Sequence, residues 1–147
     1  MDIISKIPSQ IKEILRRLET AGFEAHIVGG CVRDLLMDRE PSDWDAATNA
    51  QPEEIMKIFP DSFYENDFGT VGVKVEKFTE GEGENDVVEV TTYRTEGNYS
   101  DKRRPDVVKF ADTLEKDLRR RDFTINALAL KILFPHLDSD KSSSTLS

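Results

Sequence analysis

The sequence predicts an α+β or α/β fold in which helices pack on one side of a small mixed or antiparallel sheet. Two observations support this prediction. Segments with the apolar spacing of helices alternate with short runs rich in β-branched residues. The chain has 147 residues, which is room for one ordinary domain. A single layer of strands covered by helices is the arrangement that this element order favours.

The first element that the pattern predicts is an amphipathic helix over residues 3–20. Gly22 is a typical stop for such a helix. A short buried strand follows over residues 23–28, and the glycine pair after it begins a short helix over residues 32–37. The apolar positions of the first helix follow helical spacing: Ile7, Ile11, Ile14, Leu15 and Leu18.

The rest of the chain alternates between strands and helices in the same way. In chain order we expect a strand over 43–47, a helix over 52–58, strands over 69–75 and 87–93, and a last helix from 113 to about 130. An acidic, glycine-spaced loop over residues 79–86 connects the last two strands. We expect residues 1–22 to form an N-terminal helix, residues 23–131 the main domain, and residues 132–147 a disordered tail.

Composition excludes several classes of protein. The net charge of -9 argues against a long nucleic-acid groove, because phosphate contacts require many cations. Basic residues nevertheless cluster at 102–104 and 119–121, which favours a site for a phosphorylated small molecule. The single cysteine, Cys31, excludes an internal disulfide and a cysteine-based zinc site, and we expect it to be a buried filler. No apolar run is long enough for a membrane span and no signal peptide is visible, so we expect a cytoplasmic protein.

Two aspartates one residue apart, Asp43 and Asp45, are the main chemical signal. On a strand both side chains project from the same face, while Trp44 points the opposite way into packing. Two ionised carboxylates at this separation repel each other, and a divalent cation removes the repulsion. Mg²⁺ suits carboxylate oxygens and phosphates, and a pair of such ions is the usual arrangement for nucleotidyl transfer. Taken alone, the same spacing also fits a turn or a surface pair.

A phosphate-binding turn is predicted just upstream. Gly29-Gly30 lies between a buried strand and a helix, where backbone N–H groups are free to approach a phosphate. Arg33 follows one turn later and would either reach a triphosphate with two donors or pair with Asp34. A glycine pair is a common feature. Far more specific is the combination, within residues 28–48, of a strand, a glycine turn, a helix and Asp-x-Asp.

The stretch VGGCVRDLLMDREPSDWDAAT, residues 28–48, resembles the signature of the class II tRNA nucleotidyltransferases and bacterial poly(A) polymerases, in the polymerase-β-like nucleotidyltransferase superfamily. DLRRRDFTINALAL, residues 117–130, is similar to the second hallmark of the same family. FGTVGV, EVTTYRTEGNYSDKRRPDVVKF and TLEKDL also fit its head domain in the expected order. The resemblance covers nearly everything from residue 23 to residue 130 and implies the fold of that head domain.

The resemblance also implies roles for individual residues. Asp43 and Asp45 match the metal-binding carboxylates, and Glu89 matches a third acidic residue on a neighbouring strand. Glu89 would orient metal or deprotonate the attacking hydroxyl, although an exposed strand residue fits the same position. The matches to nucleotide-binding positions are Gly29, Gly30, Arg33, Arg121, Asp122 and Asn126. The matches to a basic loop that would steer RNA or triphosphate are Arg94, Lys102, Arg103 and Arg104, whereas Arg119 and Arg120 fit a solvated surface as well as a functional role.

The implied reaction is attack by a 3′-hydroxyl of RNA on the α-phosphate of CTP or ATP, with two Mg²⁺ ions as cofactors. CCA addition to the tRNA 3′ end ranks ahead of poly(A) synthesis, because the motif sequences resemble those of CCA-adding enzymes more than those of poly(A) polymerases. Family enzymes continue into neck, body and tail domains that nothing here matches. A nucleotide-binding fragment without catalytic activity of its own is therefore the alternative from a different class, and the sequence does not indicate an oligomeric state.

Overall fold

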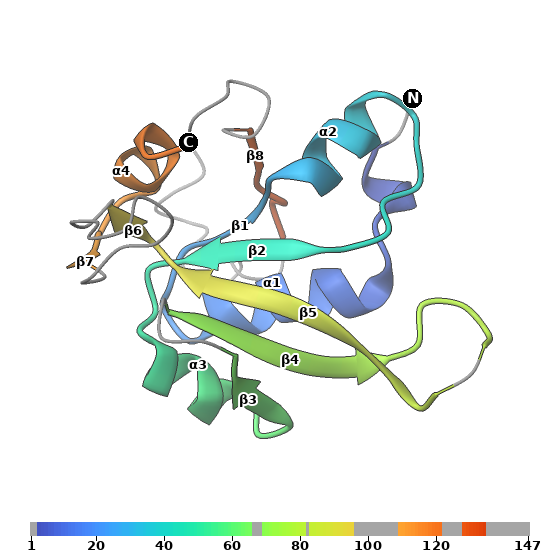
Figure 1. The fold of residues 1–147 in the computed structure, drawn as a ribbon, viewed down its shortest axis with the longest axis horizontal. Helices are drawn as coiled ribbons and strands as arrows, with labels where there is room; N and C mark the ends of the chain where they lie inside the picture. Colours follow the sequence, from blue (N-terminus) through green and yellow to red (C-terminus); the bar gives the residue numbers. More distant parts are fainter. Residues whose placement is uncertain (1–2, 66–68, 82, 96–108, 122–127, 135–147) are drawn as a thin grey trace, which may run out of the picture.

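A six-stranded sheet organises the chain in the computed structural model, which describes residues 3–65, 69–81, 83–95, 109–121 and 128–134. Its strand order is β3-β4-β5-β2-β1-β8, and β6 pairs with β7 separately (Figure 1). The helices are a 3-10 helix at Ile4–Lys6, α1 (Ser9–Thr20), α2 (Gly30–Leu36), α3 (Pro52–Ile58) and α4 (Leu114–Arg119). The strands are β1 (Ala25–Val28), β2 (Asp45–Thr48), β3 (Ser62–Tyr64), β4 (Thr70–Glu76), β5 (Asn85–Thr92), β6 (Arg94–Thr95), β7 (Lys109–Phe110) and β8 (Ala129–Leu130).

The sheet is mixed, as the sequence predicted. Strands β2 and β5 run parallel to each other, and every other neighbouring pair in the described sheet is antiparallel. The predicted hairpin is formed by β4 and β5. The short strands β3, β6, β7 and β8 were not predicted, because runs of two or three residues are too short for an alternating pattern to stand out.

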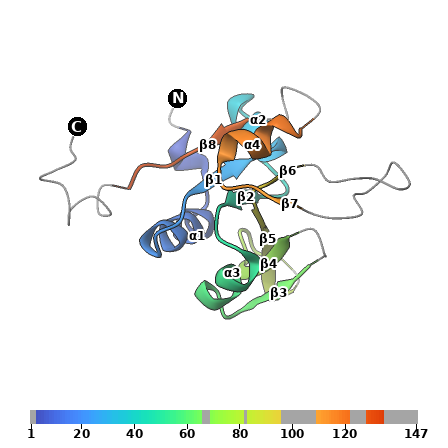
Figure 2. The same cartoon turned by 90° about the vertical axis from the view of Figure 1, so that its left-hand side faces the viewer.

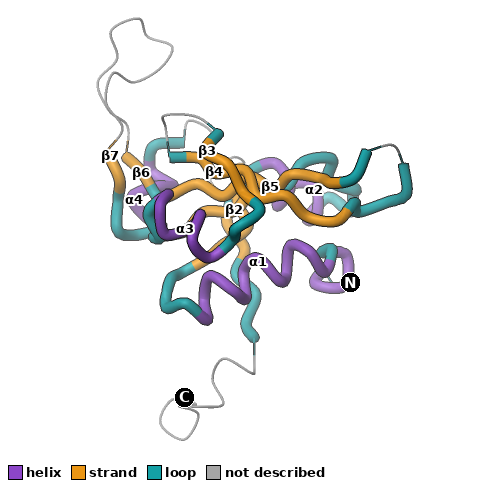
Figure 3. The backbone as a smooth tube through the Cα atoms, turned by 90° about the horizontal axis from the view of Figure 1, so that it is seen from below, coloured by secondary structure: helices purple, strands orange, loops and turns teal. Residues whose placement is uncertain are grey.

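Alternate strand residues pack into two cores on opposite faces of the sheet. Ile27 and Ala46 belong to the main core, whereas their neighbours Val28 and Ala47 belong to a smaller core with Tyr93. Helices α1 and α3 lie on the same side of the sheet (Figure 2), and α1 runs beneath the strands in the edge-on view of Figure 3. Helix α4 contributes to the smaller core, so helices cover both faces rather than the single face that we expected.

The N-terminal helix is shorter than its apolar pattern predicted. Residues 3–20 were expected to be helical, but α1 begins at Ser9 and the 3-10 turn at Ile4–Lys6 stands apart from it. Pro8 lies at the N-cap with extended ψ, and a proline disfavours helical geometry in the residue before it. The predicted apolar stripe is buried, at Ile7, Ile11, Ile14, Leu15 and Leu18.

The last predicted helix is wrong in its second half. It was expected to run from Thr113 to about Leu130, but α4 ends at Arg119 and Ala129–Leu130 forms β8. The edge of β1 accepts this strand, because Ile27 pairs with Leu130 and Val28 with Ala129. The apolar residues at the end of this segment are spaced as in a helix, but they can equally pair with an edge strand. The sequence pattern alone therefore does not distinguish a helix from a strand here.

The described chain continues as packed structure beyond residue 131. Ile132, which lies in the segment expected to be a tail, is buried in the main core, and Phe134 packs against that core. Residues 135–147 lie outside the described part of the chain. Within the described residues, no helix has the length and apolar character needed to cross a membrane.

Candidate active site

A pocket of about 520 Å³ opens beside the start of β2. Four carboxylates stand along its wall, together with aromatic and aliphatic side chains. The lining residues are Asp43, Trp44, Asp45, Phe63, Glu65, Val87 and Glu89. The pocket therefore brings together all three predicted catalytic acids and adds Glu65, which the sequence analysis did not single out.

The parallel pairing of β2 with β5 is what brings these acids together. Asp45 lies directly opposite Glu89 in the register of the two strands. Both residues share a face with the smaller core, because Ala47 and Tyr93 follow them at even spacing along their strands. Asp45 and Glu89, two of the predicted catalytic acids, therefore point to the face that α4 covers, opposite α1 and α3.

Asp43 reaches the same pocket from a different backbone setting than we predicted. The strand was expected to begin at Asp43, but β2 begins at Asp45 and Asp43 lies in the bend before it. Trp44 is only 4% exposed and packs into the main core, as the alternation predicted. The Glu89 N–H donates to the Trp44 carbonyl at 3.2 Å, which ties this bend to β5 and keeps both aspartates at the pocket.

The pocket holds more negative charge than its surroundings balance. Burial raises the pKa of Asp45, the neighbouring Asp43 and Glu65 charges raise it further, and a hydrogen bond with Glu89 and the Arg121 charge oppose the rise. The pKa of Glu65 is raised to about 7, first by a hydrogen bond with the Glu89 carboxyl, then by burial and by the Glu89 charge. None of the ion pairs between described residues includes any of these four acids.

The donor chemistry of the pocket fits a hard divalent cation. Every candidate ligand is a carboxylate oxygen, the type that Mg²⁺ and similar ions prefer, and a cation would offset the repulsion between these neighbouring acids. Among the described residues, no three His, Cys, Asp or Glu side chains already converge as ligands of one ion. To bind an ion, these side chains would therefore have to rotate towards it, or oxygen atoms of the substrate would have to complete the coordination shell of the ion.

The glycine turn lies next to Asp45. Gly29 has φ +83° and ψ -148°, a conformation that is essentially restricted to glycine, and a Cβ there would stand 3.8 Å from Asp45 Oδ2. The Gly29 N–H already donates to the Leu128 carbonyl at 3.3 Å, so this glycine contributes backbone shape rather than a free donor. The turn thus carries the chain from β1 into α2 alongside the catalytic acids.

Arg33 folds back over this turn. A Cβ on Gly30 would lie 3.2 Å from Arg33 Nη2, so the missing side chain leaves room for the guanidinium. Arg33 Nε donates to Asp34 Oδ1 at 3.2 Å, which is the pairing that the sequence left open. The Arg33 side chain remains 37% exposed, and so its outer nitrogens are accessible to a ligand.

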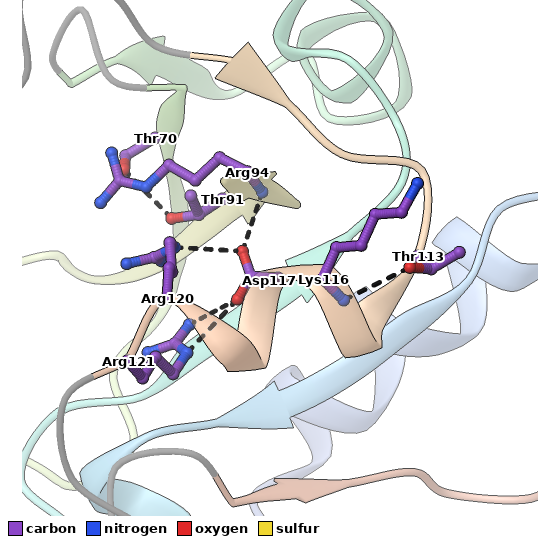
Figure 4. A network of polar contacts seen from close by, with 8 residues as sticks. All are labelled: Thr70, Thr91, Arg94, Thr113, Lys116, Asp117, Arg120 and Arg121. Carbon is purple, nitrogen blue, oxygen red and sulfur yellow. Dashed lines mark hydrogen bonds and ion pairs between the residues drawn. The ribbon is translucent and has the colours of Figure 1, made fainter. Parts of the chain in front are cut away.

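A cluster of arginines surrounds one buried acid on α4 (Figure 4). Arg121 donates to Asp117 Oδ1 from both Nη2, at 3.1 Å, and Nε, at 3.3 Å. Arg120 Nε lies 3.5 Å from Asp117 Oδ2, and the backbone N–H of Arg94 donates to the same oxygen at 2.9 Å. Arg94 and Arg121 were predicted as ligand-contacting residues, whereas Asp117 was recognised only as the start of a motif and the role of Arg120 was left open.

The exposure of these residues separates the three consecutive arginines. The side chains of Arg120 and Arg121 are 17% exposed, whereas that of Arg119 is 73% exposed and pairs with Glu115. Burial lowers the pKa of Arg120, the charges of Arg94 and Arg121 lower it further, and Asp117 opposes this effect. Acidic and basic residues three and four positions apart indicate ion pairs on one helix face, but the exposed Glu115–Arg119 pair has the same spacing, so the sequence does not distinguish this buried cluster.

Several predicted residues lie outside the described part of the chain. These are Asp122 and Asn126 among the nucleotide-binding candidates, and Lys102, Arg103 and Arg104 in the basic loop. Cys31 is buried as expected, and its Sγ donates to the Val28 carbonyl at 3.2 Å. Burial raises the pKa of this thiol to about 11, which suits packing rather than reactivity.

Comparison with known proteins gives one consistent family. A family profile described as "Poly A polymerase head domain" matches residues 25–139. The chain is similar to the CCA-adding enzyme of Lactobacillus delbrueckii subsp. bulgaricus, with 48% identity over 127 residues that cover 86% of this chain and 30% of that enzyme. The chain thus spans about 30% of the length of the relatives that it matches.

Solved structures agree with this result. The crystal structure of Bacillus stearothermophilus CCA-adding enzyme in complex with CTP superposes with a TM-score of 0.68 and 36% identity, over 90% of this chain and 31% of that one. A tRNA nucleotidyltransferase complexed with a primer tRNA and an incoming ATP analog superposes with a TM-score of 0.56 and 26% identity, over 86% of this chain and 36% of that one. The family resemblance seen in the sequence motifs is therefore confirmed at the level of fold.

Proposed function

The chain belongs to the poly(A) polymerase head-domain family, and on this premise we propose that it is the catalytic head of a CCA-adding nucleotidyltransferase. It would transfer CMP and AMP from CTP and ATP to the 3′ end of tRNA. The 48% identity to a CCA-adding enzyme and the similarity to an enzyme in complex with CTP support this choice of reaction. Enzymes of this type generally use a divalent metal, and we propose Mg²⁺, with two ions at the site.

The observation that carries the proposal is the alignment of Asp45 with Glu89 across the parallel strands β2 and β5, with Asp43 beside them in one pocket. Acids on separate strands have no reason to share a pocket for the sake of stability, since their charges repel. Their grouping supports a role in holding a cation against a phosphate. Asp43 and Asp45 would hold Mg²⁺, which would lower the pKa of the attacking hydroxyl and neutralise charge on the departing pyrophosphate.

The reaction forms a bond between the RNA 3′-oxygen and the α-phosphorus while the bond from that phosphorus to the pyrophosphate breaks. Glu89 would orient this hydroxyl or accept its proton, and its register position opposite Asp45 in the same pocket supports this role. Most of the rate would come from positioning and from charge stabilisation, because phosphoryl chemistry needs little covalent help from the protein.

The basic residues of the same face would bind the phosphates. Arg33 beside the glycine turn and Arg121, whose charge acts on Asp45, would supply guanidinium groups, which suit phosphate oxygens. We propose that Asp122 and Asn126 contact the nucleotide after Arg121. The basic residues 102–104 and Arg94 would steer the triphosphate or the RNA end.

Poly(A) synthesis is the second candidate, because the matching family profile carries that name. The two activities differ in the nucleotides that they accept and in the RNA that they extend. The head domain's charge of -9 supports a module that relies on other parts of a protein to grip RNA, so tRNA selection and base selection are not assigned to residues of this chain.

The test is to incubate the chain with Mg²⁺, tRNA that lacks its 3′-terminal CCA, and labelled CTP or ATP. Ordered incorporation of C and then A supports CCA addition, and repeated incorporation of A alone supports poly(A) synthesis. The Asp43→Asn and Asp45→Asn variants serve as inactive controls. Nucleotide binding without incorporation by the wild-type chain would mean that this segment is a binding module and not an autonomous enzyme.

A further inference from the structure

Asp117 is a fully buried carboxylate near the end of α4, with 0% exposure. The Arg94 backbone N–H and the Arg121 side chain donate to its oxygens, and Arg120 forms an ion pair with it at 3.5 Å without a hydrogen bond from Nε. Burying an ionised carboxylate is costly unless its oxygens are satisfied, and here each oxygen has a basic or amide partner. The acid therefore works as the centre around which the guanidinium groups are arranged.

A second acid on the same helix shows what this arrangement adds. Glu115 and Arg119 are four residues apart, as are Asp117 and Arg121, yet the Glu115–Arg119 side chains are 74% and 73% exposed. An exposed pair of this kind contributes little to stability and fixes neither partner in place. Asp117 and Arg121 are both largely buried, and two N–H groups of Arg121 donate to the single oxygen Oδ1, which restricts the orientation of the guanidinium.

The cluster lies next to the strand that carries Glu89. In Figure 4 the side chains of Arg94 and Arg120 lie towards Thr91 of β5, and that of Arg121 lies beside the end of α4. Thr91 is two residues beyond Glu89 and therefore shares its face, at a separation of roughly 7 Å along the strand. The charge of Arg121 lowers the pKa of Asp45, which indicates that this guanidinium lies within electrostatic reach of the pocket.

We propose that Asp117 is a positioning residue that aims Arg120 and Arg121 at the phosphates of a nucleoside triphosphate bound beside the carboxylate pocket. This inference rests on the proposed function and names a second phosphate-facing arginine, Arg120, together with the acid that orders both. The side chains of two arginines, Arg120 and Arg121, share the one carboxylate of Asp117, and guanidinium groups suit a polyanionic ligand. Without Asp117 the guanidinium groups would repel one another and lose their common direction.

The test measures binding of CTP, CMP and cytidine to the full chain in the presence of Mg²⁺. Asp117→Asn keeps the shape of the side chain but removes its charge. We expect CTP affinity to fall at least tenfold, CMP affinity to fall less, and cytidine affinity to stay unchanged. Glu115→Gln is the matched control, since it removes the same charge from the same helix, and it should bind CTP as the wild type does.

A double-mutant cycle separates positioning from general damage to the fold. If Asp117 acts through Arg121, the Asp117→Asn change should cost little additional CTP affinity in an Arg121→Gln background. If Asp117→Asn does not fold, Arg121→Lys replaces it, because lysine keeps the charge but loses the two-donor contact with Asp117. For Arg121→Lys we likewise expect CTP affinity to fall most, CMP affinity to fall less and cytidine affinity to stay unchanged.

The outcomes are distinct. Folded Asp117→Asn or Arg121→Lys protein with wild-type CTP affinity would overturn the inference and leave the proposed function standing. Equal losses for CTP and cytidine would also overturn it, since they indicate a purely structural role. Absence of CTP binding by the wild-type chain would overturn the proposed function itself, and the inference with it.

Discussion

Two charged regions on the same face of the sheet differ in how their charges are balanced. The carboxylate pocket gathers four acids, and no ion pair between described residues includes any of them. The cluster on α4 gathers three arginines around Asp117, which each of them contacts. A bound cation would balance the acids of the first region, and the guanidinium groups of the second suit an anion. Under the proposed function, a metal-bound triphosphate would supply both charges.

The largest effect on folding is expected in the arginine cluster. Asp117→Ala removes the acid and leaves buried guanidinium groups without their partner, which should lower the free energy of unfolding by about 3–5 kcal/mol. Chemical denaturation measures this change. Glu115→Ala, which breaks an exposed pair on the same helix, should cost no more than about 1 kcal/mol. Similar losses for the two variants would mean that the buried cluster does not stabilise the fold.

The carboxylate pocket should respond in the opposite way. Asp45→Asn should reduce nucleotide transfer by about a hundredfold or more, because charge stabilisation in the transition state is lost. The free energy of unfolding should stay the same or rise, since burial and neighbouring acids raise the pKa of Asp45 and so disfavour its charged form. Labelled-CTP incorporation and denaturation measured on the same samples provide the comparison. Strong unfolding of this variant would mean that the acid is structural.

The glycine turn tests whether the pocket depends on backbone shape as well as charge. Gly29→Ala places a side chain at φ +83°, which should cost about 1–3 kcal/mol of stability. The added methyl group would stand near Asp45 Oδ2 without a clash, so the cost comes from the backbone. Gly22→Ala is the control, because Gly22 is a second positive-φ glycine that lies away from the pocket. Denaturation and nucleotide transfer measured on both variants show whether Gly29→Ala loses more activity than its loss of stability explains.

The smallest expected effect concerns pH. The Glu65 pKa of about 7 exceeds its ordinary value of 4.5, so the folded chain binds more protons than the unfolded chain between these two values. Stability without divalent metal should therefore fall as pH rises from about 4.5 to 7, by less than about 1 kcal/mol because this side chain is largely exposed to solvent. Denaturation of wild type and Glu65→Gln across this range measures the difference. An equal pH slope in both would exclude Glu65 as its source.

The main elements were predictable because they depend on local patterns. The stripe of α1, the buried Trp44 between two aspartates, and the hairpin of β4 and β5 all follow from residues close together in the chain. The site residues that were recognised belong to three motif stretches, residues 28–48, 89–110 and 117–130, with distinctive sequences. Arg33 and Asp34 illustrate the limit of such motifs, since the sequence left their pairing open and only the structure shows it.

Other features depend on contacts between distant segments. Glu65 follows the unpredicted strand β3 and joins the pocket only because β3 pairs with β4, which places it near Glu89. Strand β8 pairs with the edge of β1, although the spacing of its residues in the sequence also fits a helix. Neither contact leaves a pattern in the residues around it, because the partner is elsewhere in the chain.

The amino-acid sequence by itself determined the class of fold, the family and the acids that would meet a metal, since periodicity and motif spacing are properties of neighbouring residues. Only the tertiary structure decided that Asp117 is buried among arginines while Glu115, two residues earlier, is exposed. The two acids have nearly identical sequence surroundings. What separates them is which side of a short helix meets the sheet, and that is set by packing between elements and not by the residues of the helix alone.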